Sequence, residues 1–190
     1  MAEYILELRH ISKFFPGVQA LKDVHFQLKP AEIHAIMGEN GAGKSTLIKI
    51  ITGVYHPDEG EILFNGQPIH FKSPLDAQRL GIAAVYQQVA CFPDLSVLEN
   101  IFLGHESFDS LTRKIHWREL RKKAETLLQS LDADFSPSTT MGSLSIAQQQ
   151  IVEIAKALSV DAKILIMDEP TAPLSRRECD DLYRITEGLR

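Results

Sequence analysis

Cysteines, signal sequences and membrane spans are scarce or absent in this sequence. Only two of its 190 residues are cysteine, and Cys91 and Cys179 form neither a metal-ligand spacing nor a disulfide framework. No apolar run approaches the roughly 20 residues that cross a bilayer, and the first residues, Met1 to Tyr4, carry no basic secretory region. These absences favour a soluble chain in a reducing cytosol.

An excess of charge of one sign is also missing. The chain has 20 lysines and arginines against 25 acidic residues, a net charge of −5, which argues against a protein that coats nucleic acid. One basic run, 113–123, overlaps apolar residues at helical spacing from Leu120 to Leu131, and this pattern predicts a helix with a solvated basic face. With 44% hydrophobic residues, a chain of this length can form one sizeable globular domain.

The segment Gly38–Ser45, in contrast, carries a strong functional signal, Gly-Glu-Asn-Gly-Ala-Gly-Lys-Ser. Its glycines permit a tight curl whose amide groups point at phosphate oxygens, while Lys44 can reach the outer phosphates and the Ser45 hydroxyl can ligate Mg²⁺. A flexible glycine turn is the alternative. However, an apolar run at 32–37 predicts a buried strand before the loop, and residues 46–51 carry the apolar face of a helix that should begin near Lys44. We therefore predict a nucleoside triphosphate site at Gly38, Glu39, Asn40, Gly41, Ala42, Gly43, Lys44, Ser45 and Thr46.

Two acidic residues follow the apolar run Ile164–Met167. A carboxylate at the carboxyl end of a buried strand is where NTPases with such a loop hold Mg²⁺. Asp168 is therefore predicted to bind the ion, and Glu169 to accept a proton from the attacking water. A helix-capping pair is the alternative interpretation of these two residues.

Gln87 and Ser145 are further candidates. Gln87 follows the predicted strand 82–86 and can offer an amide oxygen to Mg²⁺, although by itself it fits an ordinary surface residue. Ser145 lies in Leu-Ser-Ile-Ala-Gln at 144–148 and fits the N-cap of an amphipathic helix. Its functional interpretation is a helix N-terminus offered to a phosphate bound by a second subunit.

The remaining pattern predicts a mixed α/β lobe with a helical insertion between Gln87 and about Val160. Turns are expected at Phe15–Gly17 and Asn65–Gly66. The expected strands cover 5–14, 24–28, 61–64, 67–69, 82–85 and 164–167, and the helical pattern runs from 96 to about 158.

These motifs, in this order, resemble those of the ATP-binding subunits of ABC transporters. Gly38–Ser45 is similar to the Walker A motif, Gln87 to the Q-loop, Leu144–Gln148 to the signature motif, and Ile164–Glu169 to Walker B with its catalytic glutamate. The resemblance covers the whole chain. It implies an α/β P-loop NTPase fold of ABC type, with a mixed-sheet core lobe at 1–87 and 160–190, an antiparallel β subdomain, and a helical subdomain at 88–159.

The resemblance also implies ATP and Mg²⁺ as cofactors and gives the candidate residues roles. Phe15 falls where the family keeps an aromatic ring to stack on adenine. Ser145, Ala147 and Gln148 would contact nucleotide held by a second ATP-binding domain. The implied metal ligands are Ser45, Gln87 and Asp168, and the implied catalytic residues are Glu169 and Gln87.

Within that family the chain looks most like bacterial importers of ribose, galactose and related monosaccharides, through the stretches 15–21, 34–46, 95–104 and 149–158. This likeness implies an ATPase that energises sugar import from the cytoplasmic side of the inner membrane, as a peripheral subunit. The implied partners are membrane-spanning permease subunits, which would dock near 89–95, a second ATP-binding domain and, indirectly, a sugar-binding protein. Nucleic acid is not among them.

Some positions depart from the family pattern. Ala147 replaces the usual glycine of the signature, and Pro173 lies in the stretch 172–175 that resembles the D-loop. All seven histidines precede Asp168, whereas the family has a switch histidine beyond the D-loop. We therefore expect an N-terminal piece of a tandem protein, lacking the end of its domain and the second domain, that binds Mg·ATP with weak turnover.

Two alternatives stay open at this point. One is a non-transport ABC ATPase acting on nucleic acid or ribosomes, for which a long coiled-coil insertion or a basic linker is typical, and neither is evident between Gln87 and Ser145. The other is a nucleotide-dependent binding module without physiological turnover.

Overall fold

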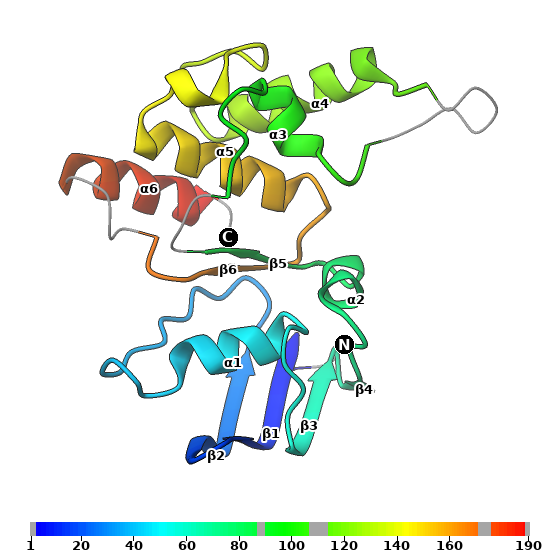
Figure 1. The fold of residues 1–190 in the computed structure, drawn as a ribbon, viewed down its shortest axis with the longest axis vertical. Coiled ribbons are helices and arrows are strands. Elements are labelled where there is room, and N and C mark those ends of the chain that lie inside the picture. Colours follow the sequence, from blue (N-terminus) through cyan, green and yellow to red (C-terminus); the bar gives the residue numbers. More distant parts are fainter. Residues whose placement is uncertain (1–2, 87–89, 107–113, 171–175, 189–190) are drawn as a thin grey trace. The chain divides into compact units, whose positions relative to one another are not determined.

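The computed structural model describes residues 3–86, 90–106, 114–170 and 176–188, which form two compact units (Figure 1). The first unit ends at Ile82 and the second begins at Ala83. Each unit is described by itself below. The division predicted from sequence, a core lobe at 1–87 and 160–190 against helices at 88–159, stays a prediction.

The first unit is built on an antiparallel sheet of four strands in the order β2-β1-β3-β4. Its strands are β1 (Leu6–Phe15), β2 (Val18–Leu28), β3 (Glu59–Phe64) and β4 (Gln67–Ile69). The predicted antiparallel β subdomain is thereby confirmed, although β2 begins at Val18 rather than at Val24. Leu6, Leu8 and Ile11 of β1 are almost fully buried beneath their neighbours.

Both predicted turns are present, and each follows from its residues. Phe15 pairs with Val18 across Pro16-Gly17, where the proline ring fixes φ and Gly17 takes φ +81°. At the β3–β4 hairpin, Asn65 and Gly66 have φ values of +50° and +75°. Positive φ at both central positions is the geometry of a type I′ turn, which asparagine followed by glycine favours.

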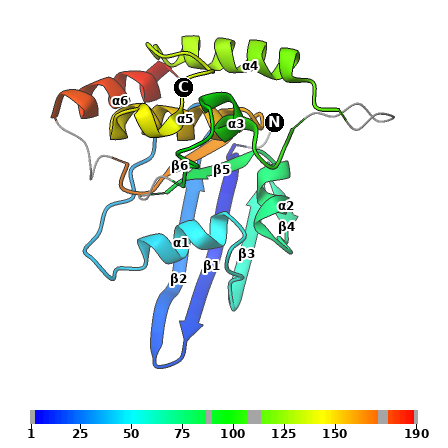
Figure 2. The ribbon, with the colours of Figure 1, turned by 45° about the horizontal axis from the view of Figure 1, so that its top comes forward.

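Two helices complete the first unit. Helix α1 (Lys44–Ile51) begins where the sequence predicts and buries its apolar residues, Leu47, Ile48, Ile50 and Ile51. In both ribbon views it lies across one face of the sheet (Figure 2). Helix α2 (Pro74–Arg79) was not predicted, although its sequence carries the signals: a capping box between Ser73 and Asp76, and proline at the first helical position.

The predicted buried strand at 32–37 is wrong. These residues form neither helix nor strand, and Ile33, Ile36 and Met37 are 59%, 37% and 89% exposed. An apolar run becomes a buried strand only when neighbouring strands satisfy its amide and carbonyl groups. In the part of the chain that the structure describes, neither sheet includes residues 32–37.

The second unit is mainly helical, as the pattern from 96 to 158 predicts. Its elements are β5 (Ile82–Val85, which begins at the unit boundary), α3 (Val97–Phe102), α4 (Trp117–Ser130), a 3₁₀ turn η1 (Met141–Ser143), α5 (Ile146–Leu158), β6 (Ile164–Met167) and α6 (Arg176–Gly188). Strands β5 and β6 pair as a small sheet. No helix in the described ranges is long and apolar enough to cross a bilayer.

The core of this unit lies among α3, α4 and α5. Ile101, Leu120 and Ile154 are each at most 2% exposed, and burying a side chain of this size contributes about 1.5–3 kcal/mol. The basic residues Arg121, Lys122 and Lys123 of α4 are exposed, while Leu120, Ala124 and Leu128 are buried. The predicted helix with a solvated basic face is confirmed.

Asn100 connects α3 to the preceding segment. Its side chain is 2% exposed, accepts a hydrogen bond from the Phe92 amide at 2.8 Å, and donates to the carbonyl oxygens of Phe92 and Ser96 at 3.0 Å each. Breaking these bonds would leave a buried amide unsatisfied, which is costly. The Asn100 side chain therefore fixes the path of residues 92–96.

Helix α5 contains a poorly solvated carboxyl group. One carboxyl oxygen of Glu153, Oε1, is buried without a hydrogen-bond partner. Burial raises the pKa of Glu153, and the charge of Lys156 opposes that rise only in part. The folded protein therefore holds this proton more tightly than the unfolded chain, and the ionised carboxylate destabilises the fold at neutral pH.

We expect Glu153→Gln to stabilise the protein at pH 7 by about 1 kcal/mol, because the neutral amide has the same shape as the carboxylate but no poorly solvated charge. The gain should shrink as the pH falls through the raised pKa of the folded protein and disappear well below the ordinary glutamate pKa of about 4.3, because Glu153 is then protonated in both states. Urea unfolding at several pH values measures this difference. Glu125→Gln, at an exposed position of α4, is the matched control and should change stability little; a gain that is independent of pH would contradict the interpretation.

Candidate functional site

The predicted phosphate loop leads directly into α1 within the first unit. Gly41 and Gly43 take φ values of +85° and +89°, and Gly43 is the left-handed N-cap of the helix. A Cβ placed on Gly43 would lie 2.6 Å from the carbonyl oxygen of Ala20 and 2.7 Å from Leu21 Cδ2. Glycine is required here because the loop packs directly against β2 and because its backbone is left-handed.

The Lys44 side chain folds back over this loop. Its Nζ donates to the carbonyl oxygens of Gly38 at 2.7 Å and Glu39 at 3.0 Å. The Ala42 amide donates to the same Glu39 carbonyl at 3.1 Å, which closes the curl. The ammonium group is thus held at the loop by neutral carbonyl acceptors, which a negatively charged phosphate oxygen can replace.

The start of α1 adds further donors. Leu47 is the first residue whose amide bonds back within the helix, to Gly43 O at 2.9 Å, so the amides of Lys44, Ser45 and Thr46 precede the intrahelical ladder. Their N–H groups and the helix dipole favour an anion at this end. The exposed Ser45 hydroxyl belongs to the same turn and supplies the hard oxygen that Mg²⁺ prefers. These residues fit the phosphates of a nucleotide and a magnesium ion.

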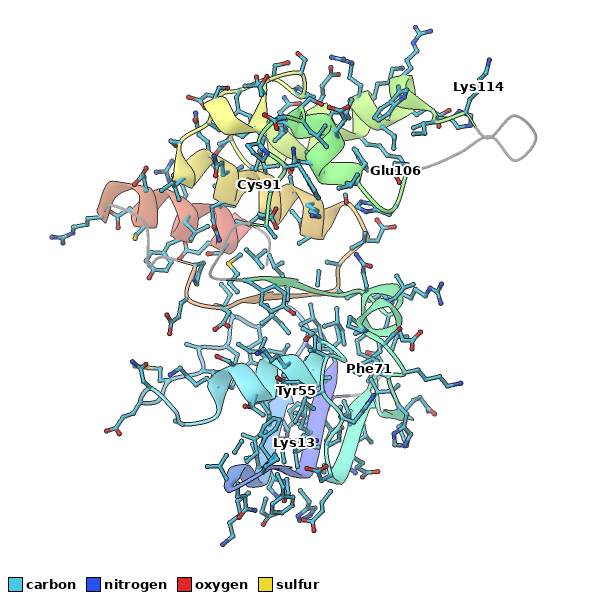
Figure 3. The ribbon with its side chains drawn as sticks, viewed as in Figure 1. Lys13, Tyr55, Phe71, Cys91, Glu106 and Lys114 are labelled. Atoms are coloured by element: carbon cyan, nitrogen blue, oxygen red, sulfur yellow. The ribbon has the colours of Figure 1, made fainter. Side chains whose placement is uncertain are left out.

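Phe15, the predicted adenine-stacking residue, lies at the end of β1 in the same unit. Its ring is 5.3 Å from that of Tyr55 in an edge-to-face arrangement, and Lys13 Nζ is 5.6 Å from its centroid. Figure 3 labels Lys13 and Tyr55. Asp58 holds this corner, accepting from the Phe14 amide at 2.6 Å and from Lys13 Nζ at 3.0 Å. Both bonds lower the pKa of Asp58, and the bond from the Phe14 amide has the larger effect.

Tyr55, which packs against Phe15, and Asp58, which bonds Phe14 and Lys13, were not predicted. In the sequence, residues 56–60 indicate only a turn. No local signal links them to a position some forty residues earlier, because the contact forms only when β3 pairs with β1.

In the second unit, the acidic pair stands at the end of β6. The Asp168 amide donates to the Val85 carbonyl at 2.9 Å, which extends the pairing of β5 and β6 to this residue. Asp168 is half-buried, whereas Glu169 is exposed and left-handed, with φ +48°. The next helix in the described residues begins at Arg176, and 171–175 lie outside the described residues, so the capping alternative stays a hypothesis.

The signature residues form the start of α5. Ser145 Oγ accepts from the Gln148 amide at 3.2 Å, while Gln148 Oε1 accepts from the Ser145 amide at 3.0 Å. This reciprocal capping box confirms Ser145 as the N-cap. Gln148 Nε2 also donates to Asp134 Oδ1 at 3.0 Å, so the Gln148 side chain is engaged within its own unit. Ala147 lies half-buried in the first turn.

The structure therefore assembles the predicted residues in separate groups. It brings Gly38–Thr46 together in one loop and places Phe15 in the same unit. Asp168, Glu169 and Ser145 belong to the second unit. Gln87 and the stretch 172–175 lie outside the described residues.

Comparison with known sequences agrees with these motifs. A family model described as ABC transporter matches residues 21–172. The ribose import ATP-binding protein RbsA 3 of Rhizobium etli is 51% identical over 189 residues, an overlap that covers 100% of this chain and 37% of that protein. The chain thus spans little more than a third of the length of this curated relative.

Two solved structures are similar over almost the whole chain. The ADP conformation of MJ1267, an ATP-binding cassette of an ABC transporter, has a TM-score of 0.84 at 29% identity, covering 98% of this chain and 76% of that one. The dimeric post-hydrolysis state of the cassette MJ0796, bound to ADP and Pi, has a TM-score of 0.77 at 27% identity, covering 97% and 82%. The fold is that of an ATP-binding cassette, and by its loop, its motifs and these matches the chain belongs to the ABC transporter family.

Proposed function

We propose that this chain binds and hydrolyses ATP to energise the import of a monosaccharide across the bacterial inner membrane. The observation that carries the proposal is the Gly38–Ser45 loop, in which left-handed glycines, the Lys44 ammonium and the N-terminus of α1 converge. An arrangement of this kind offers several donors to one anion at once.

The phosphate-binding step is an exchange of partners. Lys44 would release the Gly38 and Glu39 carbonyls and donate instead to phosphate oxygens, which carry more negative charge and form stronger bonds. The free amides of the first turn of α1 would donate to the same group. Phe15, whose ring packs edge-to-face with that of Tyr55, would stack on the base through aromatic contact.

Glu169 would act on the attacking water. Bound Mg·ATP supplies the phosphoryl group and the cation that neutralises its charge. Ser45, Asp168 and Gln87 would hold that cation through oxygen ligands. Glu169, exposed beyond the end of β6, would accept the proton of the water, and general-base catalysis contributes about 10²–10⁴-fold.

A second ATP-binding domain is the proposed partner at the start of α5. The exposed Ser145 and the first turn of its helix, with Ala147 and Gln148, would contact nucleotide bound by that domain. The dimer of the similar cassette MJ0796, bound to ADP and Pi, supports such a pairing.

The transport role rests on the ribose import relative and its 51% identity. We propose a peripheral position on the cytoplasmic side of the inner membrane, with permease subunits docking near 89–95 and a sugar-binding protein acting through them. A pocket of about 400 Å³ is lined partly by Leu98 of α3 and by the 43% exposed Trp117 of α4, and helix α3 follows that segment in the sequence. Nucleic acid is not proposed as a partner.

Replacing Lys44 by alanine tests the phosphate contact. We expect Lys44→Ala to weaken Mg·ATP binding at least tenfold, because it removes the charged donor at the loop. Isothermal titration calorimetry measures the affinity. Lys22→Ala, an exposed lysine on β2, is the control that should bind as before; equal affinity in both variants would refute the phosphate-loop assignment.

Two glycines of the loop give a matched steric test. Gly43 and Gly41 are both left-handed, but a Cβ meets Ala20 and Leu21 only at Gly43, with nothing within 4 Å at Gly41. Gly43→Ala should therefore lower both stability and ATP affinity well beyond Gly41→Ala, whose strain costs about 1–2 kcal/mol. Thermal unfolding with and without Mg·ATP measures the stability and ATP binding of both variants. If the two variants behave alike, close packing against Ala20 and Leu21 is not why glycine is needed at position 43.

Glu169→Gln separates an enzyme from a nucleotide-dependent binding module. Loss of the general base should reduce steady-state phosphate release about 10²–10⁴-fold while Mg·ATP still binds. Glu187→Gln, an exposed position on α6, should leave the rate unchanged. If Glu169→Gln turns over at the parent rate, the hydrolytic role of Glu169 is wrong.

A further inference from the structure

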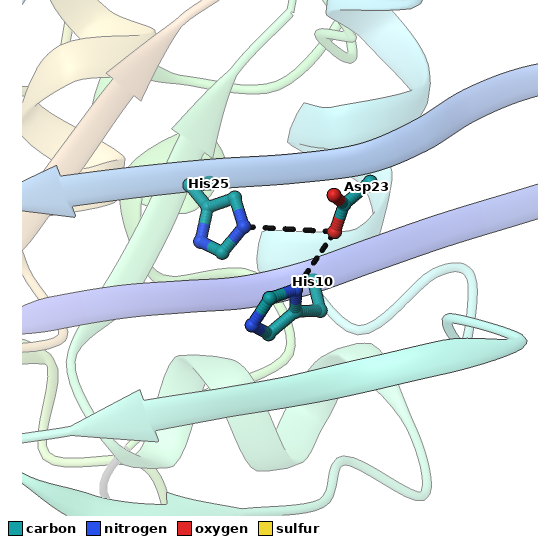
Figure 4. Close-up of side chains that lie close together, drawn as sticks. All are labelled: His10, Asp23 and His25. Atoms are coloured by element: carbon teal, nitrogen blue, oxygen red, sulfur yellow. Dashed lines mark hydrogen bonds and ion pairs between the residues drawn. The ribbon is translucent and has the colours of Figure 1, made fainter.

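Two histidines and an aspartate gather on the exposed surface of the β1–β2 hairpin (Figure 4). His10 Nδ1 lies 2.8 Å and His25 Nε2 lies 3.6 Å from the same oxygen, Asp23 Oδ1. All three potential ligand atoms lie within 4.8 Å of one another. None of these residues belongs to the phosphate loop or to the other motifs of the family.

Two backbone irregularities bring the three side chains together. On β1 an extra residue lies between the pairs Leu8–Phe26 and Ile11–Val24, and on β2 an extra residue lies before the pair Lys13–Leu21. His10 and Asp23 occupy these bulges with φ values of +55° and +49°. Bulges redirect side chains relative to the alternating pattern of a strand, and here they bring the Asp23 carboxylate within 3.6 Å of the ring of His25, two residues further along β2.

The neighbouring strand and a buried side chain hold both bulges in place. A Cβ on Gly60 of β3 would overlap the carbonyl oxygens of Arg9 and His10, so the β1 bulge packs directly against glycine backbone. The Asp23 amide donates to the Oγ of Ser12 at 3.2 Å, and Ser12 is 4% exposed. The three ligands therefore stand on a paired sheet, which orders them before any ion arrives.

The ligand chemistry selects a class of metal. Two imidazoles with one carboxylate suit zinc and its neighbours in the first transition row, whereas magnesium and calcium prefer oxygen ligands alone. Tetrahedral bonds of 2.0–2.1 Å place ligand atoms about 3.3 Å apart, between the two separations found here. The side chains of His10, Asp23 and His25 are 72%, 66% and 52% exposed, so water can complete the coordination shell.

A hydrogen bond between His10 and Asp23 does not by itself account for this arrangement. That bond needs one imidazole, yet the ring of His25 also approaches, 4.3 Å from the ring of His10 in an edge-to-face contact. Both nitrogens point toward one carboxylate oxygen (Figure 4). We propose that His10, Asp23 and His25 form a binding site for a single divalent transition-metal ion of the Zn²⁺ class.

Titration of the nucleotide-free protein with Zn²⁺ tests this site. We expect one saturable site by calorimetry, and a loss of at least tenfold in affinity in both His25→Gln and Asp23→Asn. Asparagine tolerates a left-handed backbone, so Asp23→Asn removes the charge with little strain. His34→Gln is the matched control, because His34 also faces a carboxylate, Glu32 at 3.4 Å, and it should bind Zn²⁺ as the parent does.

A second measurement uses the unmodified protein and does not depend on how the variants fold. Co²⁺ should give the visible absorption of a nitrogen- and oxygen-coordinated ion, and in a separate titration with Zn²⁺ the imidazole NMR signals of two histidines should change together. Absence of saturable binding up to about 1 mM, a level at which a specific site would be filled, would overturn the proposal. So would binding that survives in both ligand variants or is lost equally in His34→Gln.

Discussion

The close contact between Gly43 and strand β2 is the constraint on which the nucleotide site depends. A side chain at this position would run into the Ala20 carbonyl and Leu21. With glycine there, the loop rests on the sheet, and α1 begins one residue later with its apolar face buried. The same contact fixes where the first-turn amides point, so packing and anion binding have one common origin.

The β1–β2 hairpin supports three separate features of the molecule. Its tip holds Phe15, its second strand supports the phosphate loop, and its bulges present His10 and Asp23. One hairpin can carry all three features because each bulge shifts the register between its strands. The side chains that follow a bulge then point in a new direction. Glycine on β3 provides the room for that irregularity.

Sequence predicted the elements whose signals are local. The turn at Asn65-Gly66, the start of α1 at Lys44 and the N-cap at Ser145 depend on residues within one turn of each other, and all three are confirmed. Segment 32–37 shows the limit: its apolar run resembles a strand, but a strand also needs partners far along the chain. In the described residues it pairs with none and is exposed.

The sequence by itself determined the family, the phosphate loop and the class of ligand, because Gly38–Ser45 carries its chemistry in consecutive residues. Only the tertiary structure decided which distant residues meet. Asp58 joins Lys13 and Phe14, Asn100 ties down residues 92–96, and His10 faces Asp23 across a strand pair. Such contacts depend on sheet register and on bulges, and no spacing in a single sequence specifies which residues a register places side by side.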